Sequence, residues 1–266
     1  MTSHLFFNLA ALAAFLPATL VSLRRDRGRD AFFRAALAFA VAGPLAWTAV
    51  QLADSWHTGL SSALWVSISA SLLLFAVLAT WGRHAWRLTP LLLPYLFLLG
   101  LIATIWQRAE GKVMAKGGPV AWVEFHIVVS VATYGLLTLA AMAALAAFLQ
   151  ERALKSKRPN RLTRVLPPVT VGEELSGVLL IASEVVLGLG LLSGMALQYT
   201  ESGILIHPDH KTVFSVLAFL VIGALLAAHR MIGVRGKAAA RLVLLAYLLL
   251  TLAYPGVKFV TDVLLR

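Results

Sequence analysis

The 266-residue chain contains no cysteine, and charged residues make up only 13% of it. The lack of cysteine excludes disulfides, iron–sulfur ligation by thiolates and covalent haem attachment through a CxxCH motif. A water-soluble domain is typically about a quarter charged, whereas 60% of this chain is hydrophobic. The composition therefore excludes an ordinary soluble enzyme, and the length leaves room for roughly eight membrane crossings.

Motifs of soluble catalysis are missing as well. The sequence has no GxxxxGK[ST] loop, no HExxH, no GxSxG and no cluster of carboxylates, so it holds no complete hydrolytic or phosphoryl-transfer site. The net charge of +11 would indicate a nucleic-acid partner in a soluble protein. Here the basic residues lie in short segments between apolar runs, which is a topology signal. We therefore expect no nucleic-acid partner, and the sequence favours a non-enzymatic protein.

Eight apolar runs predict an all-α, polytopic transmembrane bundle that forms one integral membrane domain over residues 1–266. Each run is long enough to cross a bilayer as a helix, so the lipid bilayer is the first expected partner. The runs are 5–22, 31–53, 60–82, 88–106, 124–150, 173–198, 211–229 and 241–263.

The basic residues predict the orientation of the bundle. If the segment 24–30 is cytoplasmic, alternation places 83–87, 151–172 and 230–240 on the same side. That side then carries 17 of the 23 lysines and arginines, in agreement with the positive-inside rule. Both termini are expected on the outer side, and the expected location is the cell inner membrane.

His126 opens the fifth run. Together with Ser130 and Tyr134 it lies on one face of the predicted helix, because the three positions are four residues apart. A neutral imidazole there can ligate haem iron or another transition metal, and Tyr134 is expected to lie beside the bound cofactor. The alternative is an interfacial histidine that is hydrogen-bonded to a loop.

His210 opens the seventh run at the same predicted membrane level. In one interpretation it is incidental to a helix start, because Pro208 breaks the chain and Asp209 caps the helix. In the other, His126 and His210 supply two imidazoles to one six-coordinate haem iron. The basic residues expected to face the haem propionates in that case are Lys211, Lys258, Arg108, Lys112 and Lys116.

Three further features lie inside the predicted spans. Glu184, near the middle of the sixth, has no partner in its own helix, and it keeps a small-molecule transporter open as an alternative. His229 closes the seventh span at the inner face, where snorkelling beside Arg230 is the plain interpretation. Gly190 and Gly194, spaced as GxxxG, predict close helix packing. Lys258 has a second interpretation, an i,i+4 pair with Asp262.

The last four spans resemble the cytochrome c assembly family of CcsA-type membrane proteins, and within it the YpjD-like inner-membrane branch. The resemblance divides the chain into a divergent part, 1–106, and a family-like part, 122–266. Four segments in order carry it: HIVVSVATYGLLTLAAMAALAAFLQERALK (126–155), LPPVTVGEELSGVLLIASEVVLGLGLLSG (166–194), HKTVFSVLAFLVIGALLAAHRMIGVRGKAAAR (210–241) and LAYPGVKFV (252–260).

The resemblance implies that the protein binds haem b, or hands haem to apocytochrome c at the outer face, beside other cytochrome c biogenesis membrane proteins. It assigns the outer-face histidine of the family to His126 and adds His229 as a possible internal ligand. The chain departs from haem-handling members at two places. TESGILIHPDHKT (200–212) contains no tryptophan where those members have a WxWD segment, and no histidine follows the last span. A membrane scaffold or accessory subunit without haem is therefore the second hypothesis.

Overall fold

The computed structural model describes residues 2–23, 30–54, 59–82, 84–107, 120–203 and 209–264. Within these ranges the regular structure is helical, and eight helices are long and apolar enough to cross a membrane. The predicted all-α polytopic bundle is therefore confirmed, and the protein is a multi-pass membrane protein. The segment 108–119, which holds Arg108, Lys112 and Lys116, lies outside the described residues.

The first half of the bundle contains four spans. The first span consists of two helices, because Pro17 cannot donate a hydrogen bond to the carbonyl four residues earlier and the helix breaks at Ala14. The elements of this half are α1 (Thr2–Ala13), α2 (Phe15–Ser22), α3 (Ala31–Asp54), α4 (Leu60–Trp81), the 3₁₀ turn η1 (Ala85–Leu88) and α5 (Thr89–Ile105).

The second half contains the other four spans. Its last span widens into π-helical turns around Pro255, whose ring does not fit a regular α-helix interior. The elements are α6 (Val120–Lys155), α7 (Val169–Ser202), α8 (His210–Ile232), α9 (Gly236–Thr251), η2 (Leu252–Gly256), α10 (Val257–Phe259) and η3 (Val260–Leu264).

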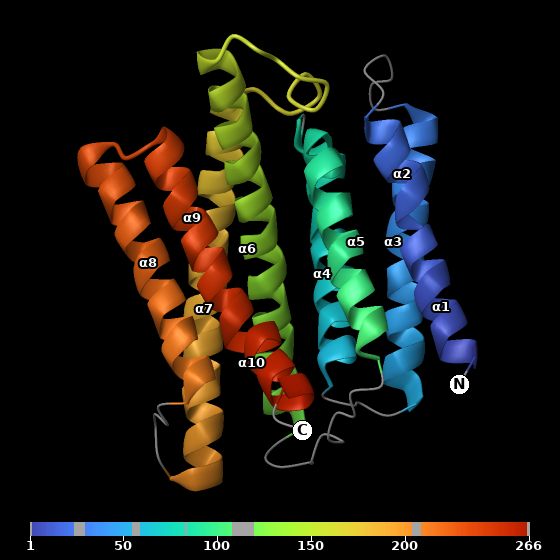
Figure 1. The fold of residues 1–266 in the computed structure, drawn as a ribbon. Helices are drawn as coiled ribbons and strands as arrows, with labels where there is room; N and C mark the ends of the chain where they lie inside the picture. The colour runs from blue at the N-terminus through green and yellow to red at the C-terminus, as the bar shows by residue number, and fades with distance from the viewer. Residues whose placement is uncertain are drawn as a thin grey trace.

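The helices run side by side, and α1 starts at the same end of the bundle at which η3 finishes (Figure 1). We call this the terminal end. The α6–α7 and α8–α9 connections lie at the opposite end (Figure 1). We call that the basic end, because these two connections and the helix ends beside them carry Arg152, Lys155, Lys157, Arg158, Arg161, Arg164, Arg230, Arg235 and Lys237.

α6 is the central helix of the bundle. It packs most extensively against α7 and on another side against α4, which joins the two halves. Alanines make the close contact possible. A Cβ added at Gly172 of α7 would lie 3.1 Å from the Cβ of Ala147. In an apolar 18-residue window of α6, 67% of the residues are buried, against 17% in the corresponding window of α8, so α8 is the most peripheral span.

α6 and α7 extend beyond the apolar runs that predicted them. α6 continues to Lys155, which pairs with Glu151 one turn earlier, and α7 begins at Val169, directly after the two prolines. With 36 and 34 residues, these helices are about 50 Å long at 1.5 Å per residue, against a hydrocarbon core of about 30 Å.

The α6–α7 connection is held by polar contacts. The backbone N–H of Asn160 donates to Thr163 Oγ1 at 3.0 Å, and the N–H of Thr163 donates to Asn160 Oδ1 at 2.8 Å. Gln150 on α6 donates to the carbonyl of Leu166 at 3.2 Å. The segment predicted to set topology is therefore an ordered turn that fixes α6 against α7.

A hydroxyl cluster joins the two halves inside the bundle. Tyr247 on α9 donates to Tyr134 on α6 at 3.2 Å and accepts from Thr138 at 3.3 Å. Its hydroxyl also forms a hydrogen bond with Tyr95 on α5. Tyr134 and Tyr247 are both buried, so the cluster ties α5, α6 and α9 together where water is excluded.

A second buried network holds the first half near the terminal end. Asn8 on α1 accepts from the indole N–H of Trp47 at 3.0 Å and from that of Trp65 at 2.7 Å. Its amide donates to Gln107, just past α5, at 2.6 Å. One side chain therefore connects α1, α3, α4 and the end of α5.

Candidate functional site

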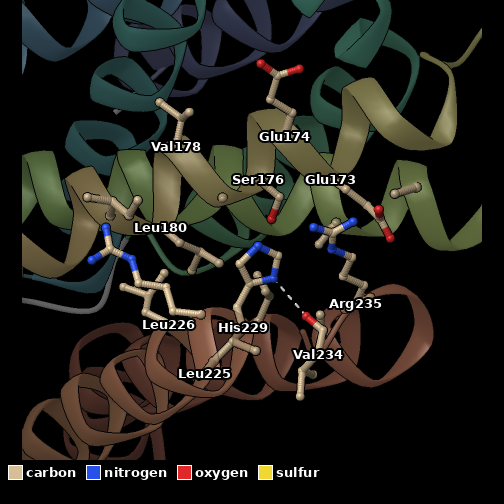
Figure 2. A pocket seen from close by; sticks show the side chains of 18 of the residues that line it. Glu173, Glu174, Ser176, Val178, Leu180, Leu225, Leu226, His229, Val234 and Arg235 are labelled. Carbon is tan, nitrogen blue, oxygen red and sulfur yellow. Dashed lines mark hydrogen bonds between the residues drawn. The ribbon is translucent and has the colours of Figure 1, made fainter. Parts of the chain in front are cut away.

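A pocket of ≈ 830 Å³ opens at the basic end among α6, α7, α8 and α9. Its volume lies in the range of small-molecule and cofactor sites. Apolar side chains such as Leu180, Leu225 and Val243 form much of its wall. Figure 2 shows His229 pointing from α8 into this space, toward Ser176 and Leu180 of α7.

The orientation of His229 follows from the way α8 ends. Gly233 adopts a left-handed conformation with φ of 66°, and the chain turns so that the carbonyl of Val234 faces the ring. The Nδ1–H of His229 donates to this carbonyl at 2.8 Å (Figure 2). In the neutral imidazole the Nε2 lone pair is then available, which is the arrangement found in metal-ligating histidines.

Charges of both signs surround the mouth of the pocket. Arg230 and Arg235 are exposed and line it. Glu173, one turn into α7, accepts a hydrogen bond from the backbone N–H of Gly236 at 2.9 Å, which holds the start of α9 against α7. The two guanidinium groups can bind an anionic group at the mouth, such as a carboxylate or phosphate.

Glu184 lines the deep part of the same pocket. It lies eleven residues after Glu173, about 16 Å farther along α7. Its Oε1 would lie 3.1 Å from a Cβ added at Gly223 of α8. The glycine therefore leaves the space into which the carboxyl group fits.

His126 is oriented from the other end of the bundle. Its Nδ1 lies 2.9 Å from Ser193 Oγ on α7, and the Ser193 hydroxyl donates to the carbonyl of Gly190 at 3.0 Å. The serine oxygen therefore accepts from the His126 Nδ1–H, and Nε2 keeps its lone pair in the neutral ring. The ring lies over Gly194, where an added Cβ would be 3.0 Å from Cε1. The close packing predicted for the GxxxG pair is found at Gly194, whereas a Cβ added at Gly190 would make only an ordinary contact, 3.5 Å from Val129 Cγ1.

His210 is the first residue of α8 at the terminal end and is exposed. Asp209 caps this helix, because its Oδ1 accepts from the N–H of Thr212 at 2.7 Å, as predicted. Lys211 is exposed beside His210. Among the contacts of the described residues, none joins His126 to His210, because His126 faces α7. Their joint ligation of one iron stays a prediction.

The structure gives contacts of their own to two further candidates. Tyr134 shares a helix with His126, but its hydroxyl belongs to the cluster around Tyr247. Lys258, on α10, has its ammonium 5.8 Å from the ring centre of Tyr254. The side chain of Asp262 is not among those that the structure describes, so its pairing with Lys258 stays a prediction.

The profile of the family described as cytochrome C assembly protein matches residues 32–265. A curated relative from Azospirillum brasilense, named "Uncharacterized 28.8 kDa protein in nifR3-like 5'region", is 57% identical over 270 residues that cover both chains completely. This chain belongs to the cytochrome c assembly protein family. Membership supports a role in cytochrome c biogenesis. The match begins at residue 32, well before the segments that carried the resemblance, while assignment to the YpjD-like branch stays a prediction.

Haem is the cofactor that the cytochrome c assembly family implies, and the pocket at the basic end fits it. An imidazole with a free Nε2 can bind iron, the guanidinium groups of Arg230 and Arg235 can bind propionates, and the walls are largely apolar. At the terminal end, the His126 ring likewise has an acceptor for its Nδ1–H in Ser193, and the ring itself fills the space above Gly194.

Several residues that shape the two histidine environments and the pocket were not predicted as site residues from the sequence. Ser193 and Val234 orient the two rings, and Gly223 makes room for Glu184. Arg235 was interpreted only as a topology signal. The GxxxG pair was the available signal for Ser193, since a helix face that carries two glycines brings its intervening residues close to the neighbour.

Proposed function

We propose that this protein binds haem b without a covalent link, in the inner membrane, as part of cytochrome c biogenesis. The observation that carries the proposal is the Nδ1–H···O contact of 2.8 Å between His229 and Val234, which turns Nε2 toward a pocket of suitable size. When bound, haem would supply an iron centre that accepts an imidazole ligand and can carry redox chemistry.

The residues of the chain have separate tasks in this proposal. His229 provides the ligand at the basic end, and Val234 fixes its ring. Arg230 and Arg235 hold the propionates at the mouth. The apolar walls limit the access of water to the bound group. Together they would select a planar amphiphile with an apolar body and an anionic edge.

His126 is the proposed ligand at the terminal end, with His210 as its partner and Lys211 and Lys258 beside the propionates. This second site would handle haem at the outer face before its delivery to apocytochrome c. The family to which the chain belongs supports such a role, and the Ser193 contact supports an oriented His126 ring.

Absorption spectra of the detergent-purified protein test the proposal. We expect a Soret band in the wild type and an extracted pigment with the spectrum of b-type haem. With haem at both sites, His229→Ala, His126→Ala and His210→Ala should each lose part of the band. A loss in His229→Ala alone would assign the haem to the pocket, and losses in His126→Ala and His210→Ala alone would assign it to the terminal end. His84→Ala is the matched control, because His84 is half-buried before η1 and does not line the pocket.

A preparation that stays colourless after haem supplementation, while it remains folded and co-purifies with another membrane protein, would contradict haem binding and support the scaffold hypothesis.

A further inference from the structure

The carboxyl group of Glu184 is only partly satisfied. Its Oε2 is buried and has no hydrogen-bond partner among the described residues, while Oε1 lies against the backbone of α8 at Gly223. A charged carboxylate in this position would lose hydration without a compensating contact, which is costly inside a bilayer. A carboxyl group that binds a proton avoids this cost.

No cationic side chain among the described residues lies next to the Glu184 carboxyl group to balance a negative charge. The titratable and charged groups that share its pocket are Glu173 and Glu174 on α7, His229 and Arg230 on α8, and Arg235 before α9. All lie toward the mouth. α6 and α9 contribute only small or apolar side chains to the lining, namely Ala144, Ala147, Ala239, Ala240 and Val243. No salt bridge to Glu184 exists among the described residues.

The pocket connects Glu184 with the aqueous side. It is lined continuously along one face of α7 from Glu173 through Gly177 to Glu184, and positions seven residues apart share a helix face. A Cβ added at Gly177 would meet nothing within 4 Å. The route past Gly177 is therefore open.

We propose that Glu184 is a proton-binding site that exchanges its proton with the aqueous phase at the basic end through this pocket. The ligand is the proton itself, so the inference does not depend on haem binding and is tested on protein without added haem. Its failure and the failure of the haem proposal are therefore distinguishable.

Labelling with dicyclohexylcarbodiimide, which reacts with protonated carboxyl groups in apolar surroundings, tests the site. The carboxyl proton moves to a carbodiimide nitrogen while the carboxylate oxygen bonds to the central carbon. The resulting O-acylisourea rearranges to an N-acylurea that retains all atoms of both reactants. We expect the adduct on the peptide that contains Glu184, with a yield that falls as the pH rises, and none at this position in Glu184→Gln. A folded protein in which Glu184 stays unlabelled at every pH would overturn the site.

Hydrogen–deuterium exchange of the carboxylic C=O infrared band tests the route. The band that disappears in Glu184→Gln should shift rapidly in D₂O in the wild type and in Gly177→Ala. In Gly177→Phe, whose ring fills the open space, the shift should slow several-fold. Gly177→Leu replaces the phenylalanine variant if size-exclusion chromatography shows that the latter does not fold. Equal exchange rates in the bulky and alanine variants would overturn the pocket as the proton path.

Discussion

The hydroxyl of Tyr247 on α9 donates a hydrogen bond to the hydroxyl of Tyr134 on α6 at 3.2 Å. Tyr134 was predicted to lie beside a cofactor, together with His126. Its contact with Tyr247 makes it part of the buried cluster that joins the two halves of the bundle, and its place beside a cofactor stays a prediction. A structural role therefore accounts for the burial of Tyr134.

Tyr247→Phe should lower the free energy of unfolding by about 1 kcal/mol, because hydrogen bonds between membrane helices contribute roughly 0.6–1.7 kcal/mol. The substitution keeps the ring and removes the hydroxyl that contacts Tyr134, Tyr95 and Thr138. Unfolding in mixed micelles measures the change. Tyr199→Phe is the control, since Tyr199 lies 56% exposed on α7 and its variant should match the wild type. Equal stability of the two variants would contradict the role of the cluster.

Ser193→Ala should weaken haem retention at the terminal end by about 10- to 100-fold if His126 is a ligand, which is the usual effect of removing a group that orients a metal-bound histidine. The alanine removes the acceptor of the His126 Nδ1–H and changes little volume. Haemin titration, followed in the Soret region, gives the dissociation constant. Ser130→Ala is the matched control, because Ser130 is exposed one turn from His126. An unchanged constant in Ser193→Ala would count against His126 as a ligand.

Arg235→Gln should raise the haemin dissociation constant about tenfold, since a charge-assisted hydrogen bond contributes about 1.5–3 kcal/mol. The effect should shrink as salt is added, because the guanidinium is exposed and screened. The same titration at two ionic strengths measures both. Lys237→Gln removes an equal charge two residues away at a position that does not line the pocket. The proposed propionate contact would be wrong if both variants lost affinity equally.

Asn8→Leu should destabilise the protein, whereas Gln51→Leu should not. The first leaves the indole N–H groups of Trp47 and Trp65 without the oxygen that accepts from both, and it should cost about 2 kcal/mol. Gln51 Oε1 is buried with no partner among the described residues, so leucine there should be neutral or stabilising. Thermal unfolding followed by tryptophan fluorescence compares them. Destabilisation of similar size in both would argue that bulk, not hydrogen bonding, determines the result.

The amino-acid sequence was sufficient to predict features that depend on the residues of a single helix, such as its apolar length, its cap and its small-residue face. Apolar runs predicted the eight spans, Asp209 predicted a helix cap, and the GxxxG spacing predicted the close contact found at Gly194. The ends of α6 and α7 were predicted too short, because polar residues such as Glu151 and Lys155 continue the helix beyond the hydrocarbon, where hydropathy carries no signal.

The site was less accessible to prediction, because it depends on which way each helix faces. His210 begins α8 and His126 lies in the second turn of α6 at the same end, but the packing of α6 directs His126 toward Ser193 on α7. The pocket arises from four helices and from a left-handed Gly233 that turns the Val234 carbonyl onto His229. The contact between the Val234 carbonyl and His229 depends on backbone conformation, which the amino-acid sequence does not state directly.

The length of α6 and α7 has a consequence for how the protein meets the compartments on its two sides. Both helices exceed the hydrocarbon core by about 20 Å, and they pack against each other more extensively than any other pair of described helices. The two helices are therefore expected to project beyond the bilayer as one packed unit. The ends of α6 and α7 outside the hydrocarbon core offer a soluble partner an ordered surface, even though the described residues include no separate soluble domain. A partner that tilts the projecting ends of α6 and α7 would move His126, Ser193 and Glu184 together, because these three residues lie on the two packed helices.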